Sequence, residues 1–217
     1  MVILPIYISC MILAAMVTFV FGFLAGREFL ISSNSGEAMV ADEIKSKFRL
    51  QHALLNNVTV ETERGTAQID HILVTGKGIF VIETKHYGGW IYGNPSDSHW
   101  TQVHFKKKSR FLNPIRQNYG HVKAIEALFT LPESAFIPLV VFTGDAEFKK
   151  DVGPKVIKLP QLLPELSADR PIIFDEKKMT YIVGRIEMKR LRRSIETDEY
   201  HLDSVRRRIQ ARAMARA

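Results

Sequence analysis

The sequence predicts an α/β protein in which a mixed β-sheet is flanked by helices and preceded by one N-terminal transmembrane helix. Three observations support this fold class. The first 26 residues carry no charged side chain, several β-rich runs are separated by turn residues, and segments with helical spacing lie before and after those runs. Charged residues make up 24% and hydrophobic residues 46% of the 217-residue chain, which is the composition of a globular protein.

The first 27 residues are expected to form the transmembrane anchor. About 20 helical residues cross a hydrocarbon core of ~30 Å, and the apolar run is long enough for this. A cleaved signal peptide is the alternative, but it needs a basic segment before its apolar core. Here the first basic residue, Arg27, comes after the run. By the positive-inside rule we expect a single-pass protein of the cell membrane, with its N-terminus outside, its C-terminal domain in the cytoplasm and the lipid bilayer as a partner.

Charge and cysteine content narrow the function classes. The net charge of +7 is compatible with a nucleic acid or an anionic lipid surface as partner. The single cysteine, Cys10, lies inside the apolar run. A single cysteine is too few for an intrachain disulfide framework or for a cysteine-rich zinc site within one chain.

A polar linker is expected over residues 28–36, followed by an amphipathic helix. Val40, Ala41, Ile44 and Phe48 recur at the spacing of one helical face. Glu37 lies on this same face, in the first turn, where an apolar residue is expected. Glu37 either complements the positive end of the helix dipole or belongs to a functional site.

The middle of the chain alternates between strand and helix patterns. Asn113-Pro114 is a typical helix start, with proline at the tolerated first position. The expected strands cover 57–62, 67–75 and 79–85, begin again at 90, and include 135–143, with a helix between 113 and 131. Trp90 is interpreted as a core residue. We place the domain at 37–150 and a C-terminal extension with a basic helix at 151–217.

The basic helix has two interpretations. Leu202, Val205 and Ile209 mark one of its faces, and Arg206-Arg207-Arg208 lie among them. Such a helix can lie on a bilayer or against a nucleic acid, or it can pack on the domain through its apolar stripe.

The strands at 67–75 and 79–85 predict a charged cluster. If Gly76-Lys77 form a two-residue turn, then residues whose numbers sum to 153 are opposite one another. Asp70 then lies opposite Glu83, and Lys85 lies on the same face of the hairpin. Strands rich in Ile, Val and Phe are expected to be buried, and buried strands rarely carry three charged groups unless these form ion pairs or belong to a functional site.

Two close carboxylates repel each other unless a cation lies between them, and Mg²⁺ (or Mn²⁺) suits such oxygen ligands. The metal would polarise a phosphoryl oxygen and activate a water. Lys85 would then orient or deprotonate that water, or neutralise charge on the phosphate. The carbonyl of Thr84 and the carboxylate of Glu37 are further candidate ligands. The alternative is a half-exposed strand pair with a cross-strand salt bridge and no further function.

Three separated motifs resemble the nuclease-related domain (NERD) family: Gly65-Thr-Ala-Gln-Ile-Asp-His-Ile-Leu-Val, Gly78-Ile-Phe-Val-Ile-Glu-Thr-Lys-His-Tyr-Gly-Gly-Trp-Ile-Tyr-Gly, and Asn113-Pro-Ile-Arg-Gln-Asn. The resemblance covers about residues 35–150. It implies a restriction-endonuclease-like fold of the PD-(D/E)xK superfamily, whose members are typically Mg²⁺-dependent. Ile69 stands where the superfamily name has proline.

Carried over to this chain, the resemblance assigns roles to five residues. Asp70 and Glu83 would bind the metal, Lys85 would be the catalytic lysine, Glu37 the carboxylate of the first helix, and Gln117 the polar residue of the later helix that faces the site. His71 also matches a family position, and its role stays undecided.

Five basic residues near the third motif are candidate contacts to nucleic acid: Lys106, Lys107, Lys108, Arg110 and Arg116. Such residues neutralise phosphates without reading sequence, although a solvated hairpin tip also suits a lysine run. The sequence therefore predicts a membrane-anchored, metal-dependent endonuclease that cleaves nucleic acid, DNA more readily than RNA. A catalytically inactive membrane scaffold that binds nucleic acid or a protein is the alternative.

Overall fold

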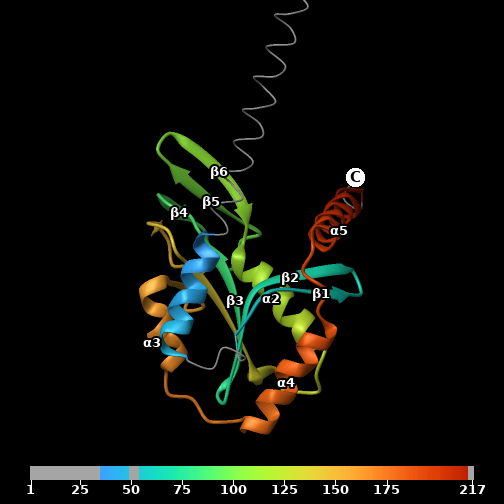
Figure 1. Ribbon diagram of the computed structural model, residues 1–217. Helices are drawn as coiled ribbons and strands as arrows, with labels where there is room; N and C mark the ends of the chain where they lie inside the picture. Colours follow the sequence, from blue (N-terminus) through green and yellow to red (C-terminus); the bar gives the residue numbers. More distant parts are fainter. Residues whose placement is uncertain (1–34, 49–53, 215–217) are drawn as a thin grey trace, which may run out of the picture.

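The computed structural model describes residues 35–48 and 54–214, and Figure 1 shows its ribbon. The anchor expected over residues 1–27 and most of the linker at 28–36 lie outside the described residues. Within the described ranges, no helix is both long enough and apolar enough to cross a bilayer. The described residues form the predicted mixed α/β structure with flanking helices, but its strands are divided between two mixed sheets and not gathered in one.

The larger sheet has five strands in the order β1-β2-β3-β7-β9. The first three strands are antiparallel, whereas β7 is parallel to β3 and β9 is parallel to β7. Their bounds are β1 (Leu54–Thr62), β2 (Gly65–Thr75), β3 (Gly78–Lys85), β7 (Phe136–Phe142) and β9 (Val156–Lys158). Because β9 follows residue 150, the C-terminal part of the chain supplies one edge of this sheet.

The smaller sheet has four strands in the order β6-β5-β4-β8. Their bounds are β4 (Trp90–Tyr92), β5 (His99–His104), β6 (Lys107–Leu112) and β8 (Glu147–Phe148). The β5–β6 hairpin projects from the end of the molecule at which β3 ends (Figure 1). One face of the sheet packs on Phe142 of β7 through Ile91, Trp100 and Phe111.

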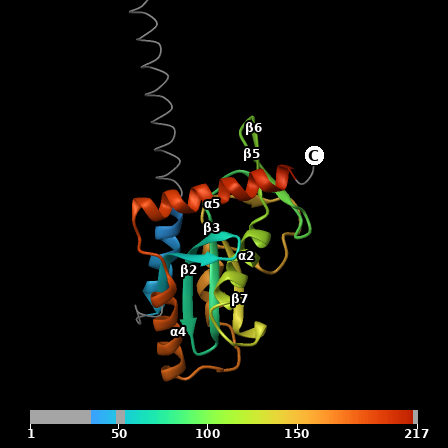
Figure 2. The same ribbon diagram turned by 90° about the vertical axis from the view of Figure 1, so that its right-hand side faces the viewer.

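Helices cover both faces of the larger sheet. The first helix spans residues 35–47, so it already includes Ser35 and Gly36. This helix and α3 (Leu162–Ser167) cover one face through apolar side chains such as Ile44 and Leu162. The other face is covered by α2 (Pro114–Glu126) and α4 (Glu176–Lys189), through Ile125 and Ile182 among others. Figure 2 shows α5 (Ile195–Met214) crossing above β2 and β3.

The β2–β3 hairpin has the register expected from its turn. Thr75 pairs with Gly78, and the ladder continues outward to His71 and Ile82, so paired numbers sum to 153. The described ladder ends there, one step before Asp70 and Glu83. On the other side of β2 the ladder to β1 skips Asn57, whose φ is 52°. Asp70 is therefore released from regular pairing on both sides, which frees its side chain for other contacts.

Trp90 was expected in the core, and this expectation is wrong. Trp90 is 48% exposed, whereas its neighbour Ile91 is fully buried. The reason is the two-residue period of a strand, which places neighbours on opposite faces of β4. The buried tryptophan is Trp100 of β5.

The C-terminal helix packs through polar contacts rather than through its apolar stripe. Leu202 and Ile209 are exposed, while Ser204 is buried. The Ser204 hydroxyl accepts a hydrogen bond from the backbone N–H of Thr66 at 2.9 Å, and the His201 ring contacts the Thr66 hydroxyl at 2.9 Å. Of the two interpretations of this helix, packing through the apolar stripe is therefore not supported by Leu202 and Ile209, whereas Val205 is half-buried.

Candidate active site

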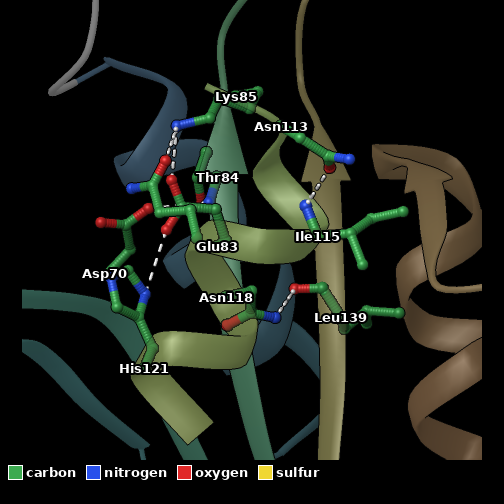
Figure 3. Close-up of polar contacts among 10 residues, drawn as sticks. Asp70, Glu83, Thr84, Lys85, Asn113, Ile115, Asn118, His121 and Leu139 are labelled. Carbon is green, nitrogen blue, oxygen red and sulfur yellow. Dashed lines mark hydrogen bonds and ion pairs between the residues drawn. The ribbon is translucent and has the colours of Figure 1, made fainter. Parts of the chain in front are cut away.

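The charged residues predicted to converge do so at the end of β3. Figure 3 shows the Glu83 carboxylate between Lys85 above and His121 below, with Asp70 beside it. Glu83 and Lys85 are on the face of β3 that is covered by α2, because Val81, two residues earlier, packs in the same cluster as Ile125. Helix α2 completes the group with Gln117 and His121, which lie one turn apart.

The α2 helix is positioned by two buried asparagines. Asn113 caps its start, because its side-chain oxygen accepts a hydrogen bond from Ile115 N–H at 2.9 Å, and Pro114 occupies the first turn. Asn118 donates to the carbonyls of Val81 in β3 and Leu139 in β7, at 2.9 and 3.0 Å. These bonds tie the helix to two adjacent strands, so Gln117 and His121 are held against the end of β3.

Glu83 is the centre of the hydrogen-bonded group. It is 1% exposed. Its Oε1 accepts from Lys85 Nζ at 2.5 Å, and its Oε2 lies 3.2 Å from His121 Nδ1. Burial alone would raise the pKa of Glu83, but Lys85 and His121 outweigh it and lower this pKa to about 2. Glu83 is therefore an anion at neutral pH.

Lys85 is held in its charged form. Burial disfavours its charge, but the adjacent Glu83 carboxylate outweighs burial and raises the pKa of Lys85 above its usual value. Its Nζ also donates to Gln117 Oε1 at 3.2 Å. A lysine that keeps its proton neutralises negative charge or orients a water, and it is unsuited to deprotonate one. Of the three roles that the sequence left open, the structure thus disfavours deprotonation of the water and leaves the other two.

Asp70 has the opposite electrostatic character to Glu83. Its Oδ2 accepts a hydrogen bond from the backbone N–H of Thr84 at 2.7 Å, which orients the carboxyl toward the end of β3. Burial is the largest cause that raises the pKa of Asp70 well above its usual range, and the charges of Glu83 and Glu37 add to it. Two carboxyls with pKa values pushed in opposite directions indicate a site short of positive charge.

Glu37 reaches this site from the other side of the sheet. It lies in the helix over residues 35–47, and burial followed by the charge of Glu83 raises its pKa. A hydrogen bond from the Asn57 side chain and the charges of Arg193 and Lys85 act against this shift. The structure thus places Glu37 within electrostatic reach of Glu83, as expected from its position on the apolar face.

The chemistry of this donor set suits a divalent cation with few protein ligands. Across residues 35–48 and 54–214, no three His, Cys, Asp or Glu side chains are grouped closely enough to hold a metal by themselves. Mg²⁺, however, usually takes one or two carboxylates and completes its shell with water and phosphate. The Glu83 Oε2 atom is buried without a hydrogen bond of good geometry, and at Asp70 burial and the charges of Glu83 and Glu37 outweigh the Thr84 N–H and Lys85. A cation bound to the Asp70 and Glu83 carboxylates would give Glu83 Oε2 a partner and would favour the charged form of Asp70.

Thr84 and His71 lie on the opposite face of their strands from Glu83. The Thr84 side chain is largely buried and its hydroxyl has no hydrogen-bond partner, so the side chain is packed rather than presented to the site. His71 is buried beside Asn56, whose side-chain oxygen lies 2.7 Å from its Nδ1. Burial lowers the pKa of His71 to about 4, so it is a neutral core residue at physiological pH.

The five basic candidates for nucleic-acid contact are all exposed. Four are on the β5–β6 hairpin: Lys106 at its tip, and Lys107, Lys108 and Arg110 in β6. Arg116 is in the first turn of α2, and it donates to the carbonyl of Ser96 at 2.5 Å. These residues lie in the hairpin and at the start of α2, and the site residues Gln117 and His121 follow on the same helix.

His121 was not singled out from the sequence. The signal that could have found it is its spacing of four residues from Gln117, which places both on one helical face. The pattern was inconspicuous because a lone histidine on a helix is more often structural than functional.

Comparison with known proteins places these residues in a family. The family model of the nuclease-related domain (NERD) matches residues 32–143, which is a little more than half of the chain. An uncharacterized protein of Bacillus anthracis is 50% identical over 95 residues, a stretch that covers 43% of this chain and 45% of the relative. The chain thus spans less than half the length of that relative. No solved structure matches significantly.

Proposed function

Because the chain belongs to the nuclease-related domain (NERD) family, we propose that it is a divalent-metal-dependent nuclease that hydrolyses phosphodiester bonds of nucleic acid, DNA in preference to RNA. Placement in the PD-(D/E)xK superfamily is consistent with this family. The single observation that carries the proposal is the buried group Asp70, Glu83 and Lys85 at the end of β3, in which one carboxyl has a raised pKa beside another with a lowered one.

Each residue of the group has a defined role in this proposal. Asp70 and Glu83 would hold Mg²⁺ or Mn²⁺, with the Thr84 carbonyl as a further oxygen ligand and Glu37 bound through a water. When bound, the metal supplies polarisation of the phosphoryl oxygen and a water of lowered pKa. Lys85 places its ammonium beside the phosphate to offset charge that develops there. Gln117 holds Lys85 by accepting its hydrogen bond, and His121 holds the Glu83 carboxylate.

The test is cleavage by the full chain, purified in a mild detergent, on labelled DNA and RNA with Mg²⁺ or Mn²⁺. Asp70→Asn and Lys85→Met are each expected to lower the rate by about 10³-fold, since several kcal/mol of transition-state stabilisation is removed. Lys45→Met is the matched control, because Lys45 is an exposed lysine whose ion-pair partner among the described residues is the exposed Asp42. If the wild type and all three variants are equally inert with both metals, the proposal is wrong.

A second candidate function is a membrane scaffold without catalytic activity, which binds nucleic acid or a protein. The observation in its favour is that Glu83 already has Lys85 as a partner and Asp70 already binds Thr84. Titration calorimetry separates the two candidates. Mn²⁺ binding that Asp70→Asn abolishes supports the nuclease, and salt-sensitive DNA binding with no heat on metal addition supports the scaffold.

We also propose that residues 1–27 anchor the protein in the cell membrane with the domain on the cytoplasmic side. The apolar run and the basic residues that follow it support this. Alkaline extraction should leave the chain in the membrane fraction, and protease added to intact cells should spare the domain. Release by alkali contradicts the anchor, and digestion from outside contradicts the orientation.

A further inference from the structure

The outer face of the four-stranded sheet exposes aromatic side chains in a regular pattern. Trp90 and Tyr92 of β4 are 48% and 36% exposed, and they flank the fully buried Ile91. Strand alternation therefore turns both rings away from the core that lies under Ile91 and Trp100. A tryptophan and a tyrosine side by side on an exposed sheet face need an explanation beyond folding.

The sheet register aligns each ring with a cation. Trp90 pairs with Val103, which pairs with Lys108, and Tyr92 pairs with Thr101, which pairs with Arg110. Each lateral row thus begins with an aromatic ring and ends with a basic residue two strands away, or about 10 Å. The two rows are two residues apart, or about 6.6 Å along the strand.

The Trp90 ring is held in place rather than free. The Lys149 ammonium lies 4.6 Å from its centroid, and the Glu147 carboxylate accepts a hydrogen bond from the indole while it pairs with Lys149. Glu147 is the only acidic residue in β4, β5, β6 and β8. Since its charge is offset by Lys149, the face presents net positive charge around two oriented rings.

We propose that this face, defined by Trp90, Tyr92, Lys108 and Arg110, is a base-stacking platform for a single strand of nucleic acid. Exposed rings stack on unpaired bases, and flanking cations follow the backbone phosphates. A duplex hides its base faces and would engage only the cations. The proposal rests on the proposed nuclease function and deepens it, because it assigns the substrate class: nucleic acid with a single-stranded segment.

The platform is close enough to the candidate active site to serve it. Trp90 follows Lys85 by five residues, so their Cα atoms are at most about 18 Å apart. The connecting segment is fixed to the sheet, since the Gln102 side chain donates to the Gly88 carbonyl at 2.8 Å. At the far end of the hairpin, Phe105 is 91% exposed beside Lys106 and extends the same chemistry. The platform is thus within the length of a few nucleotides of Lys85, and a bound strand would pass around the edge of the smaller sheet to reach it, because the rings face away from Phe142, the β7 partner of Lys85.

Tryptophan fluorescence gives a direct test, because the sequence has two tryptophans and Trp100 is fully buried. The full chain in detergent, with EDTA present to prevent cleavage, is titrated with a dT oligonucleotide and with a duplex of equal length. Stacking should quench Trp90 with the oligonucleotide and much less with the duplex. Fluorescence anisotropy of labelled dT gives the dissociation constant.

The variants distinguish base stacking on Trp90 and Tyr92 from a general effect of exposed apolar side chains. Trp90→Ala and Tyr92→Ala should each weaken dT binding at least about 5-fold, as expected for one stacked base. Trp90→Phe should keep affinity and lose the quenching. Tyr181→Ala is the matched control, because Tyr181 of α4 is similarly exposed and also lies near a lysine, with Lys178 Nζ 5.3 Å from its ring. Its dissociation constant should not change.

Three outcomes overturn the platform. They are equal dT affinity of the Trp90→Ala variant and the wild type, a Trp90 emission shift with phosphatidylserine vesicles but not with dT, and self-association that Trp90→Ala abolishes. None of these touches the nuclease proposal, because binding is measured without metal. Conversely, the chain could bind dT through Trp90 and yet cleave no nucleic acid. That result would support the platform and contradict the nuclease proposal.

Discussion

The two sheets of this protein treat charge in opposite ways. The five-stranded sheet is covered on both faces, and three of its charged residues, Asp70, Glu83 and Lys85, are gathered at one end, where Glu83 pairs with Lys85 and both act electrostatically on Asp70. The four-stranded sheet is covered on one face only, and its charged residues, three in β6 and Glu147 in β8, are exposed. Burial makes each charge of the first group dependent on its neighbours, whereas solvent makes those of the second group nearly independent.

This difference indicates that the covered sheet suits catalysis and that the open sheet face suits binding. A site that shifts pKa values needs low dielectric and fixed partners, which only the covered sheet offers. A surface that binds an extended polymer needs an exposed area several residues long that accepts different bases, and the open sheet face offers such an area. Substitutions in the covered sheet should therefore change folding stability together with activity, and those on the open face should change binding alone.

The sharpest test of this comparison uses the two tryptophans. Trp100→Ala should lower the free energy of unfolding by about 4 kcal/mol, because it empties a fully buried site next to Phe142. Trp90→Ala, on the opposite face of the same sheet, should cost less than about 1 kcal/mol. Urea unfolding monitored by circular dichroism measures both. Equal losses would show that the outer face is as much part of the core as the inner face.

The second test removes the cation from the covered site. Lys85→Met leaves Glu83 buried without its partner, and should cost about 3 kcal/mol at neutral pH. Since the folded-state pKa of Glu83 is about 2, against 4.5 ordinarily, its contribution is present above pH 4.5 and is lost as the pH falls toward 2. The difference between variant and wild type should shrink over that same range.

Lys45→Met serves as the control for this substitution, because the exposed Lys45–Asp42 pair is expected to contribute less than about 1 kcal/mol. A loss at Lys85 that is no larger than the loss at Lys45, or that does not change between pH 7 and pH 2, contradicts the burial argument.

Much of the candidate site could be predicted from the sequence because a two-residue turn fixes the register of a hairpin. The register set by Gly76-Lys77 predicted that Asp70 and Glu83 lie close together, and the observed ladder follows that register as far as His71 and Ile82. Trp90 was misplaced because a strand of three residues does not reveal which face is buried. The strand β9 and helix α3 have only three and six residues, too few for a periodicity, yet they complete the larger sheet and its cover. His121 could be recognised only once α2 lay against Glu83.

The third test is a substitution that should stabilise the folded protein, whereas most substitutions destabilise it. Asp70→Asn should stabilise the metal-free protein and raise its melting temperature at neutral pH, because burial and the charges of Glu83 and Glu37 raise the pKa of Asp70 and so oppose its ionisation in the folded state. Because the pKa of Asp70 is raised in the folded state, its ionisation weakens folding as the pH rises from about 3.8 through the raised value. Asparagine keeps an oxygen for the Thr84 N–H and carries no charge.

The same variant should also lose the rise in melting temperature that Mn²⁺ gives the wild type, since a ligand stabilises only a state that binds it. A lower melting temperature for metal-free Asp70→Asn at pH 7 would mean that Asp70 is a structural partner of Lys85 and not an uncompensated charge.

The smallest effect on stability is expected on the hairpin. Replacing Lys107 and Lys108 by glutamine should leave the melting temperature unchanged, because both side chains are exposed. It should, however, reduce the salt dependence of dT binding, by roughly 0.7 in the slope of log K against log salt for each lysine that contacts a phosphate. The matched control replaces Lys177 and Lys189 of α4, which are also exposed. Both doubles remove the same charge, so equal slopes would mean that net charge alone draws nucleic acid to the protein. A slope that falls only in the hairpin variant assigns the attraction to β6, on the sheet that is open to solvent.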